Sequence, residues 1–480
     1  MPQHDTLFIG GEWIAPSSNR TITVVSASTE EIIGSVPEAQ EADVDAAVAS
    51  ARAAFEDPNG WSSWEPANRA AAMERFANGL DNRSGEIARL VSAQNGMPIA
   101  ISTAFEGAFP SILLRYYAGV LKEAVFEETR PGMLGGQTVV RRGPIGVVGA
   151  IVPWNFPQSL SAFKYAPALA AGCTLVIKPS PETVLDSVLI AEAAAEAGIP
   201  GGVINFVPGG REIGAYLVAH PGVDKISFTG STAAGRSIAE TCGRLLRPVT
   251  LELGGKSAAI VLDDADLDLA TVGEKLFAAT LLNNGQTCFL GTRVLAPRSR
   301  YAEVVDTFAA LASSLKVGDA LDATTQIGPM ASDRQRDRVE GYIAKGKAEG
   351  ARVVVGGGRP SGQDKGWFVE PTIFADVDNN HTIAQEEIFG PVLSLIPYSD
   401  LDDAVRIAND SDFGLGGSVW TRDEERGLGV ARRVQTGTIG VNTYAPDPTA
   451  PFGGVKASGL GRELGPEAIG HYQQVQSIYT

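Results

Sequence analysis

The segment IGVVGAIVPWNFPQSLSAFKYAPALAAGCTLVIKP, residues 145–179, decides the fold class of this 480-residue chain. It opens with an apolar, β-branched run at 145–153 that is bounded by glycine and proline. A helical stretch follows at 159–172, and a second apolar run follows at 173–179. Strands that are apolar throughout are buried on both faces, which is typical of a parallel sheet covered by helices on each side.

The same alternation continues outward from this segment. Further strand-like runs lie at 202–209, 223–230 and 248–255, and helical runs separate them at 184–198, 212–220 and 233–243. A second α/β region begins near Lys256. Its predicted strands are 257–262, 292–297, 351–358, 391–398 and 438–442, and its predicted helices include 301–315, 334–350 and 401–410. The pattern predicts two open parallel-sheet α/β domains that meet at residues 252–257.

The ends of the chain differ from these two domains. The first hundred residues are expected to form short strands and then helices, at 43–56 and 68–96. Residues 126–143 and the C-terminal 474–480 contain β-prone residues but no core of their own. We expect these two segments to act as sheet edges that pair between subunits, as a small oligomerisation element.

Composition excludes several classes of partner. Apolar residues make up 44% and charged residues 20% of the chain, which is typical of a soluble globular protein. A formal charge of −17 argues against nucleic acid and against an anionic membrane, because both bind basic surfaces. No apolar run is long enough to span a membrane, and the first residues carry no secretory pattern.

Cysteine and histidine usage points to a reducing compartment. Cys173, Cys242 and Cys288 are far apart, and the four histidines are scattered. Neither a disulfide framework nor a metal site is therefore expected, and a cytoplasmic location is predicted. Cys173 and Cys242 have apolar neighbours and are expected to be small buried hydrophobes.

Four short motifs fall at the carboxyl ends of predicted strands, where open α/β sheets bind their ligands. They are PWNFP (153–157), KPSPET (178–183), FTGSTAAG (228–235) and LELGGK (251–256). The third begins a helix and could hold a phosphate on its backbone N–H groups, although Gly-Ser-Thr is also an ordinary helix cap. Lys178 could contact ribose hydroxyls or could be a solvated strand end.

Two residues have the character of reactive groups. Glu252 lies in a short apolar strand, where partial burial would raise its pKa towards that of a general base. The alternative is that strand alternation places Glu252 on a solvated face. Cys288 follows the polar turn NNGQT (283–287), which does not fit a buried bystander. It is therefore a candidate nucleophile.

These motifs together resemble the aldehyde dehydrogenase superfamily. Seven motifs occur in the family's order: PWNFP, KPS, FTGS, LELGGK, GQTC, EEIFGPV (386–392) and PFGGVKASGLGRE (451–463). The resemblance implies NAD(P)-dependent oxidation of an aldehyde through a cysteine thiohemiacetal and a thioester. It also implies a Rossmann-like NAD(P)-binding domain, a catalytic domain, and an oligomerisation element that builds a homodimer or homotetramer. Their ranges would be 1–124 with 144–252, then 253–445, and finally 125–143 with 466–480.

The resemblance assigns catalytic roles to four residues. Cys288 would be the nucleophile and Glu252 the base that activates water. Asn155 would donate to the oxyanion together with the backbone N–H of Cys288. Lys164 would help to relay protons.

The resemblance also implies the cofactor and substrate residues. The NAD(P) site would include Trp154, Lys178, Gly230, Ser231, Leu253, Glu387 and Phe389. Glutamate often stands three residues after this lysine in strict NAD users, but here that position is Pro181 and the carboxylate is Glu182. A carboxylate repels a 2′-phosphate, so its displacement leaves NADP possible, while NAD is preferred.

The substrate is expected to be apolar. The residues matching the family's aldehyde tunnel are Leu160, Phe163, Phe289 and Phe452. They favour an aliphatic, terpenoid or aromatic aldehyde, although Phe163 could simply pack in the core. Alternatives are a cofactor-independent thiol esterase, a CoA-acylating aldehyde dehydrogenase and a non-catalytic binding protein. A thiol esterase usually pairs its cysteine with a histidine, and no motif of this sequence contains one. CoA acylation would not need Glu252.

Overall fold

Residues 145–179 fold as strand, helix and strand. The computed structural model describes residues 4–480 and shows β7 (Val147–Ile151), α6 (Pro157–Ala171) and β8 (Thr174–Lys178). The two strands pair in parallel, with Ile151 opposite Lys178. Every residue of both strands and of α6 is buried. The prediction of strands buried on both faces is therefore confirmed for this unit.

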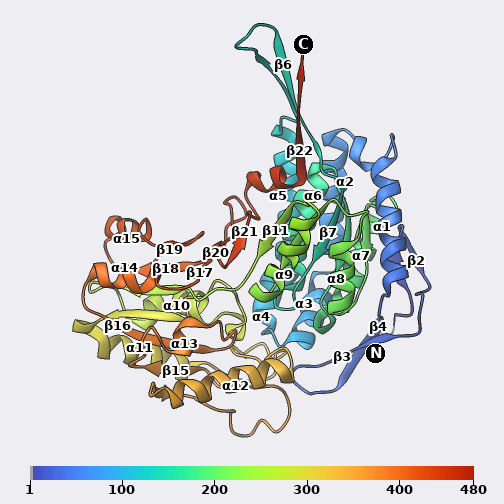
Figure 1. The fold of residues 1–480 in the computed structure, drawn as a ribbon. Coiled ribbons are helices and arrows are strands. Elements are labelled where there is room, and N and C mark those ends of the chain that lie inside the picture. The colour runs from blue at the N-terminus through green and yellow to red at the C-terminus, as the bar shows by residue number, and fades with distance from the viewer. Residues whose placement is uncertain (1–3) are drawn as a thin grey trace.

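The first large sheet is built around this unit in one lobe of the molecule (Figure 1). Its strand order is β21-β11-β10-β7-β8-β9. All neighbours are parallel except β21, which is antiparallel to β11 at the edge. The other strands are β9 (Ile204–Phe206), β10 (Lys225–Thr229), β11 (Val249–Glu252) and β21 (Gly459–Leu460).

Helices cover both faces of this sheet. One core packs α1 (Glu41–Glu56), α8 (Arg211–Ala219) and α9 (Thr232–Arg244) against one face of the sheet. A larger core on the opposite face includes α6 and four other helices. These are α2 (Pro66–Asp81), α3 (Ser84–Asn95), α5 (Phe109–Glu123) and α7 (Asp186–Glu196).

The second large sheet lies in the other lobe and follows the order β14-β15-β16-β13-β12-β18-β19. Only β14 is antiparallel to its neighbour. Its strands are β12 (Ala258–Val261), β13 (Arg293–Pro297), β14 (Arg352–Val355), β15 (Thr372–Ala375), β16 (Val392–Tyr398), β18 (Gly417–Trp420) and β19 (Gly440–Val441). Two of them, β15 and β18, were not predicted, because their sequences, TIFA and GSVW, contain only two or three consecutive apolar residues.

The helices of the second lobe flank this sheet (Figure 1). They are α10 (Leu269–Thr280), α11 (Tyr301–Ser314), α12 (Asp333–Ala348), α13 (Thr382–Gln385), α14 (Leu401–Asn409) and α15 (Glu424–Ala431). Two α/β lobes with mostly parallel sheets confirm the predicted fold class.

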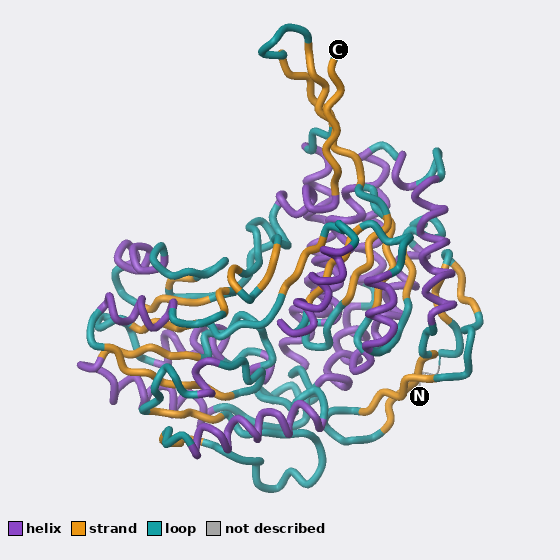
Figure 2. Tube along the Cα trace, in the orientation of Figure 1, coloured by secondary structure: helices purple, strands orange, loops and turns teal. Residues whose placement is uncertain are grey.

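A narrow three-stranded sheet projects from the first lobe (Figures 1 and 2). It consists of β5 (Glu127–Pro131), β6 (Gln137–Pro144) and the C-terminal β22 (Gln473–Tyr479), in the order β22-β6-β5. The two β-prone segments thus pair with each other within one chain, whereas the sequence pattern had suggested pairing between subunits. We call this sheet the arm.

The remaining elements are short. Two N-terminal hairpins pair β1 (Leu7–Ile9) with β2 (Glu12–Ile14) and β3 (Thr21–Val25) with β4 (Ile32–Pro37). The strands β17 (Phe413–Gly414) and β20 (Val455–Lys456) form a two-stranded sheet, and α4 (Ile99–Ser102) leads into a π-helical turn at Thr103–Ala108. Within residues 4–480, no helix is both long and apolar enough to cross a membrane.

Candidate active site

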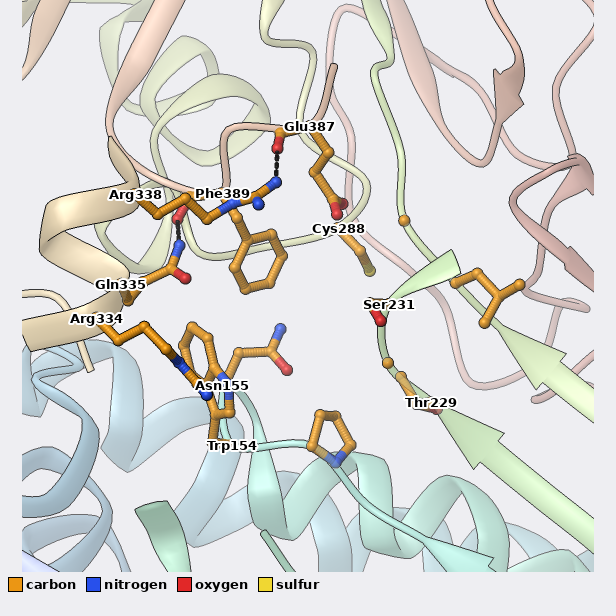
Figure 3. Close-up of a pocket in the computed structure, with 14 residues that line it drawn as sticks. Trp154, Asn155, Thr229, Ser231, Cys288, Arg334, Gln335, Arg338, Glu387 and Phe389 are labelled. Carbon is orange, nitrogen blue, oxygen red and sulfur yellow. Dashed lines mark hydrogen bonds between the residues drawn. The ribbon is translucent and has the colours of Figure 1, made fainter. Parts of the chain in front are cut away.

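A cavity of about 430 Å³ lies where residues of the two lobes meet (Figure 3). The first lobe contributes the segment after β7 and the turn after β10 to its wall, and the second lobe contributes α12 and the segment before β16. Its lining residues are Pro153, Trp154, Asn155, Thr229, Gly230, Ser231, Leu253, Gly254, Cys288, Arg334, Gln335, Arg338, Glu387 and Phe389. Motifs that are widely separated in sequence therefore share one cavity.

Asn155 is bound directly to the turn that presents Cys288. The Asn155 Nδ2 donates to the carbonyl oxygen of Gln286 at 3.0 Å, and Asn283 Nδ2 donates to the carbonyl oxygen of Asn155 at 3.0 Å. Asn95 Nδ2 also donates to the carbonyl oxygens of Trp154 and Asn155. These side-chain amides hold Asn155 and Cys288 against the same cavity. Asn95 was not recognised from the sequence, because no local pattern shows such contacts.

Cys288 is a half-buried thiol, in contrast to Cys173 and Cys242, which are fully buried as predicted. Burial raises the pKa of the Cys288 thiol, and the nearby carboxyls of Glu387 and Glu252 raise it further. The thiol is therefore protonated at neutral pH and must lose its proton before it can act as a nucleophile.

Glu252 is a buried carboxyl at the end of β11, with only 3% of its surface exposed. The alternative of a solvated face is therefore wrong. Neither carboxyl oxygen has a hydrogen-bond partner within residues 4–480. Burial raises the pKa of Glu252 well above its usual value, and the nearby Glu463 carboxyl raises it further. A Cβ atom on Gly453 would lie 2.5 Å from Glu252 Oε1, so a side chain at this position would displace the Glu252 carboxyl.

Lys164 belongs to a buried ion pair next to Glu252. Its Nζ donates to Glu463 Oε1 at 2.7 Å and to Thr229 Oγ1 at 2.6 Å. Thr229 is paired with Glu252 in the β10–β11 register. Glu463 was missed in the sequence although its motif was recognised, because 299 residues separate it from its lysine.

The segment before β16 is held on α12 (Figure 3). Arg338 Nη2 donates to the carbonyl oxygen of Glu387 at 2.5 Å, and Gln335 Nε2 donates to that of Phe389 at 2.7 Å. The Glu387 carboxyl accepts from the backbone N–H of Gly255 at 2.9 Å. Phe389 has a φ of 63°, which is unusual for a bulky residue and typical of functional sites. Its ring meets that of Trp154 edge-on, with centroids 5.4 Å apart.

The turn after β10 both caps α9 and lines the cavity where a phosphate could bind. Ser231 Oγ caps α9 by accepting from the backbone N–H of Ala234, and the N–H of Gly230 donates to the carbonyl oxygen of Glu252. Both residues also line the cavity, at the positive end of a 13-residue helix.

Lys178 is buried, so it is not a solvated strand end. Its Nζ donates to the carbonyl oxygens of Pro179 and Gly209, both at 2.8 Å. Burial lowers the pKa of Lys178 to about 8. It lies outside the lining of the cavity described above, whereas Leu253 lies within it.

A smaller, apolar cavity of about 50 Å³ meets the first cavity at Asn155 and Cys288. All four residues predicted for the substrate line it. They are joined by Phe105, Phe109, Phe156, Ser159, Leu282, Thr287 and Pro446. Phenylalanine rings meet edge to face around it, with the ring centroids of Phe163 and Phe289 each 6.2 Å from that of Phe452. Phe105 and Phe109 stand four residues apart, a spacing that could have identified them.

Known proteins resemble this chain over nearly its whole length. The profile of the aldehyde dehydrogenase family matches residues 13–478. A geranial dehydrogenase from Castellaniella defragrans is 59% identical over 476 residues, which cover 99% of this chain and 98% of that protein. An aldehyde dehydrogenase from Mycobacterium tuberculosis, solved with NAD⁺, is 49% identical with a TM-score of 0.97, covering 100% of this chain and 98% of that one. A cysteine-to-alanine mutant of aldehyde dehydrogenase C from Pseudomonas syringae, solved with NAD⁺ and octanal, is 40% identical with a TM-score of 0.95, covering 99% of this chain and 96% of that one.

Proposed function

The chain belongs to the aldehyde dehydrogenase family, and from that premise we propose that it oxidises an apolar aldehyde to the carboxylic acid with NAD as oxidant and Cys288 as nucleophile. The observation that carries this proposal is the meeting of two cavities, one large and one lined by phenylalanine, at Asn155 and Cys288. Two relatives support the apolar substrate, since one is named for geranial and another was solved with octanal.

The residues of the larger cavity fit a dinucleotide. Gly230 and Ser231 present the N-terminus of α9 to a pyrophosphate, and Glu387 suits one ribose. Lys178, which lies outside this lining at the end of β8, is proposed to meet the other ribose. A Cβ atom on Gly254 would lie 2.7 Å from Glu387 Oε2, so a side chain at this position would displace the carboxylate. Trp154, Leu253 and Phe389 provide apolar contacts. When bound, NAD accepts the hydride that leaves the aldehyde carbon.

The first chemical step uses Cys288 and Asn155. The Cys288 thiol gives up its proton, for which the nearby Glu252 carboxylate is the proposed acceptor, and its sulfur adds to the aldehyde carbon to give a tetrahedral thiohemiacetal oxyanion. Asn155 Nδ2 carries two protons, one of which is bound to Gln286, so the other can reach the oxyanion. The backbone N–H of Cys288 is the second donor. Collapse of the oxyanion leaves a thioester on Cys288.

The second step uses Glu252. A water molecule attacks the thioester, and the Glu252 carboxylate accepts its proton while Cys288 leaves as the thiolate. Because burial raises the pKa of Glu252, the carboxyl must first lose a proton, and the rate of this step should rise with pH. The buried pair of Glu463 and Lys164 lies next to Glu252 and provides a route for that proton.

Steady-state kinetics with a panel of aldehydes test this proposal. We expect NADH to form without CoA, and kcat/KM for geranial and octanal to exceed that for succinic semialdehyde by about 100-fold or more. The reason is that burying a substrate carboxylate among phenylalanines, with no charged residue in the described lining, is costly. Ester hydrolysis without NAD as the main activity, strict CoA dependence, or preference for the semialdehyde would each contradict the proposal.

Glu182 is expected to select NAD over NADP. Its Oε2 accepts from Ser180 Oγ at 2.5 Å, and its Oε1 lies 3.4 Å from Nη2 of Arg334, which lines the cofactor cavity. We predict that Glu182→Gln raises the ratio of kcat/KM with NADP to that with NAD by about 5- to 10-fold, because it removes a charge that repels a 2′-phosphate. The exposed Glu274→Gln on α10 is the control. An unchanged ratio would show that Glu182 does not face the 2′ position.

We also propose that the arm, within 125–143 and 466–480, joins subunits into a homodimer or homotetramer. The support is its fully exposed Met133 and Leu134 at the hairpin tip, together with exposed Val475 and Tyr479 on β22. We propose that the NAD-binding domain consists of 1–124 with 144–252, and the catalytic domain of 253–445. We also propose a cytoplasmic location, which suits the chain because all three cysteines are free thiols.

A further inference from the structure

A buried carboxyl, Glu106, lies behind the wall of the substrate cavity. It has no exposed surface and sits in the π-helical turn Thr103–Ala108 between α4 and α5. Phe105 and Phe109 on either side of it line the cavity, whereas Glu106 itself does not. A buried carboxyl and a π-helical turn are both unfavourable, and π-turns are frequent at functional sites.

Glu106 supplies the cap that the first turn of α6 lacks. Its Oε2 accepts from the backbone N–H of Gln158 at 2.7 Å. Gln158 carries the first N–H of the helix, because α6 begins at Pro157, and the preceding Phe156 has no side-chain acceptor. A second link joins the same elements, since Ser159 Oγ donates to the carbonyl oxygen of Phe105 at 2.5 Å. The π-turn is therefore tied to α6 at two consecutive residues.

The contacts continue from Gln158 to the segment that carries Asn155. Gln158 Nε2 donates to Asp186 Oδ2 at 2.6 Å, and Gln94 Nε2 donates to Asp186 Oδ1 at 2.7 Å. The next residue, Asn95, donates to the carbonyl oxygens of Trp154 and Asn155. Residues 154–158 are thus held at both ends by buried side chains.

We propose that Glu106 is a positioning residue for aldehyde oxidation, which fixes the first turn of α6 and so holds the Phe156–Leu160 wall and the Asn155 amide against Cys288. This inference rests on the proposed function. Glu106 acts through the residues that it holds, because Phe156, Leu160 and Asn155 line the cavity at the point where it reaches the thiol. Loss of the Glu106 carboxyl should therefore raise the KM for large aldehydes more than the KM for NAD.

The charge state of Glu106 gives the inference a second consequence. Burial raises the pKa of Glu106 to about 8. The ionisable groups that face it are Asp186 from α7, whose own pKa is raised to about 6, and Tyr165 from α6, while Glu86 and Arg89 of α3 and Arg115 of α5 are exposed. Glu106 is therefore a neutral acid at pH 7. Ionisation above pH 8 adds a negative charge that repels Asp186, which also holds Gln158. We therefore expect the KM for a large aldehyde to rise above pH 8.

Two substitutions of Glu106 separate its role as hydrogen-bond acceptor from the effect of its ionisation. Glu106→Gln resembles the neutral acid and keeps an acceptor for the Gln158 N–H, whereas Glu106→Leu removes that acceptor. We expect Glu106→Leu to raise the KM for octanal about 10-fold or more, with a smaller change for propanal and for NAD. Glu106→Gln should restore the octanal KM to within about threefold of the wild-type value at pH 7, and should abolish its rise between pH 8 and 9.

The matched control is Asp43→Leu. Asp43 is also a buried carboxyl that caps a helix, because its Oδ2 accepts from the backbone N–H of Gln40 at the start of α1. It lies outside both cavity linings. Asp43→Leu should leave the octanal KM unchanged even if it lowers the melting temperature as much as Glu106→Leu does.

Hydrogen exchange of backbone amides provides a readout independent of activity. We expect faster exchange at 156–160 in Glu106→Leu than in Glu106→Gln and wild type.

Equal octanal KM values for wild type and Glu106→Leu would overturn the proposal, as would a Glu106→Gln enzyme as impaired as Glu106→Leu. If Glu106→Leu does not fold, a wild-type KM rise above pH 8 that persists in Glu106→Gln would overturn it. A wild-type enzyme that oxidises no aldehyde would instead contradict the proposed function, while the exchange result would still test the positioning.

Discussion

Replacing Cys288 by alanine is expected to lower kcat for aldehyde oxidation by about 10⁴-fold or more and to leave the affinity for NAD within about twofold. In the proposed mechanism the thiol forms the covalent bond to the substrate, and losing a nucleophile removes the entire covalent route. The side chain at this position lines the larger cavity, where NAD is proposed to bind, and would lose only a sulfur atom, which is why cofactor binding should persist.

The measurement combines NADH formation with titration of NAD binding by fluorescence. Cys242→Ala is the matched control, because it removes a thiol that is fully buried in α9 and outside both cavities. It should retain kcat within about threefold. A Cys288→Ala enzyme with wild-type turnover would refute Cys288 as the nucleophile, and one that no longer binds NAD would show that the thiol has a structural role instead.

Replacing Glu252 by glutamine is expected to slow hydrolysis of the thioester by about 10²- to 10⁴-fold, the usual contribution of a general base. Glutamine has the shape of the carboxyl that fits against Gly453, so the site should remain assembled. It cannot accept a proton from water, so acyl-enzyme should accumulate. In the wild type the raised pKa of Glu252 means that turnover increases with pH, and this increase should be lost in the variant if hydrolysis limits the rate.

Rapid mixing with octanal and NAD measures this effect. We expect a burst of NADH equal to the number of active sites, followed by slow turnover, and mass spectrometry should find one octanoyl group on Cys288. Glu274→Gln, on the exposed face of α10, should turn over and accumulate acyl-enzyme only as the wild type does. If no acyl-enzyme is found while turnover is slow, Glu252 acts before the thioester forms.

Much of the fold could be predicted from local patterns. The apolar runs around residues 147–151 and 174–178 became neighbouring parallel strands, because strands without a polar face can only be buried on both sides. The C-terminal segment was correctly expected to form an edge strand, but its partner in the same chain was not, since β22 pairs with β6 more than 300 residues away. Nothing local specifies a pairing over that distance.

The candidate site was only partly predictable. Cys288 stood out because its polar turn differs from its surroundings, whereas Asn155 was identified only through the resemblance of its motif PWNFP to the family. The burial of Glu252 and Lys178 remained open, since the end of a strand does not show whether another element covers it. Glu463 and Glu106 were missed, because each is buried through contacts with residues far away in the sequence.

The sequence by itself determined the fold class and the order of its motifs, because hydrophobic periodicity and chain order act locally. Only the tertiary structure decided which carboxyls and amines are buried, and therefore how their pKa values shift. It also decided that Asn155 and Cys288 share one cavity and that the Glu252 carboxyl is buried close enough to raise the pKa of the thiol. Burial and contact between distant segments depend on how two lobes and their loops pack together, and a local pattern holds no record of that packing.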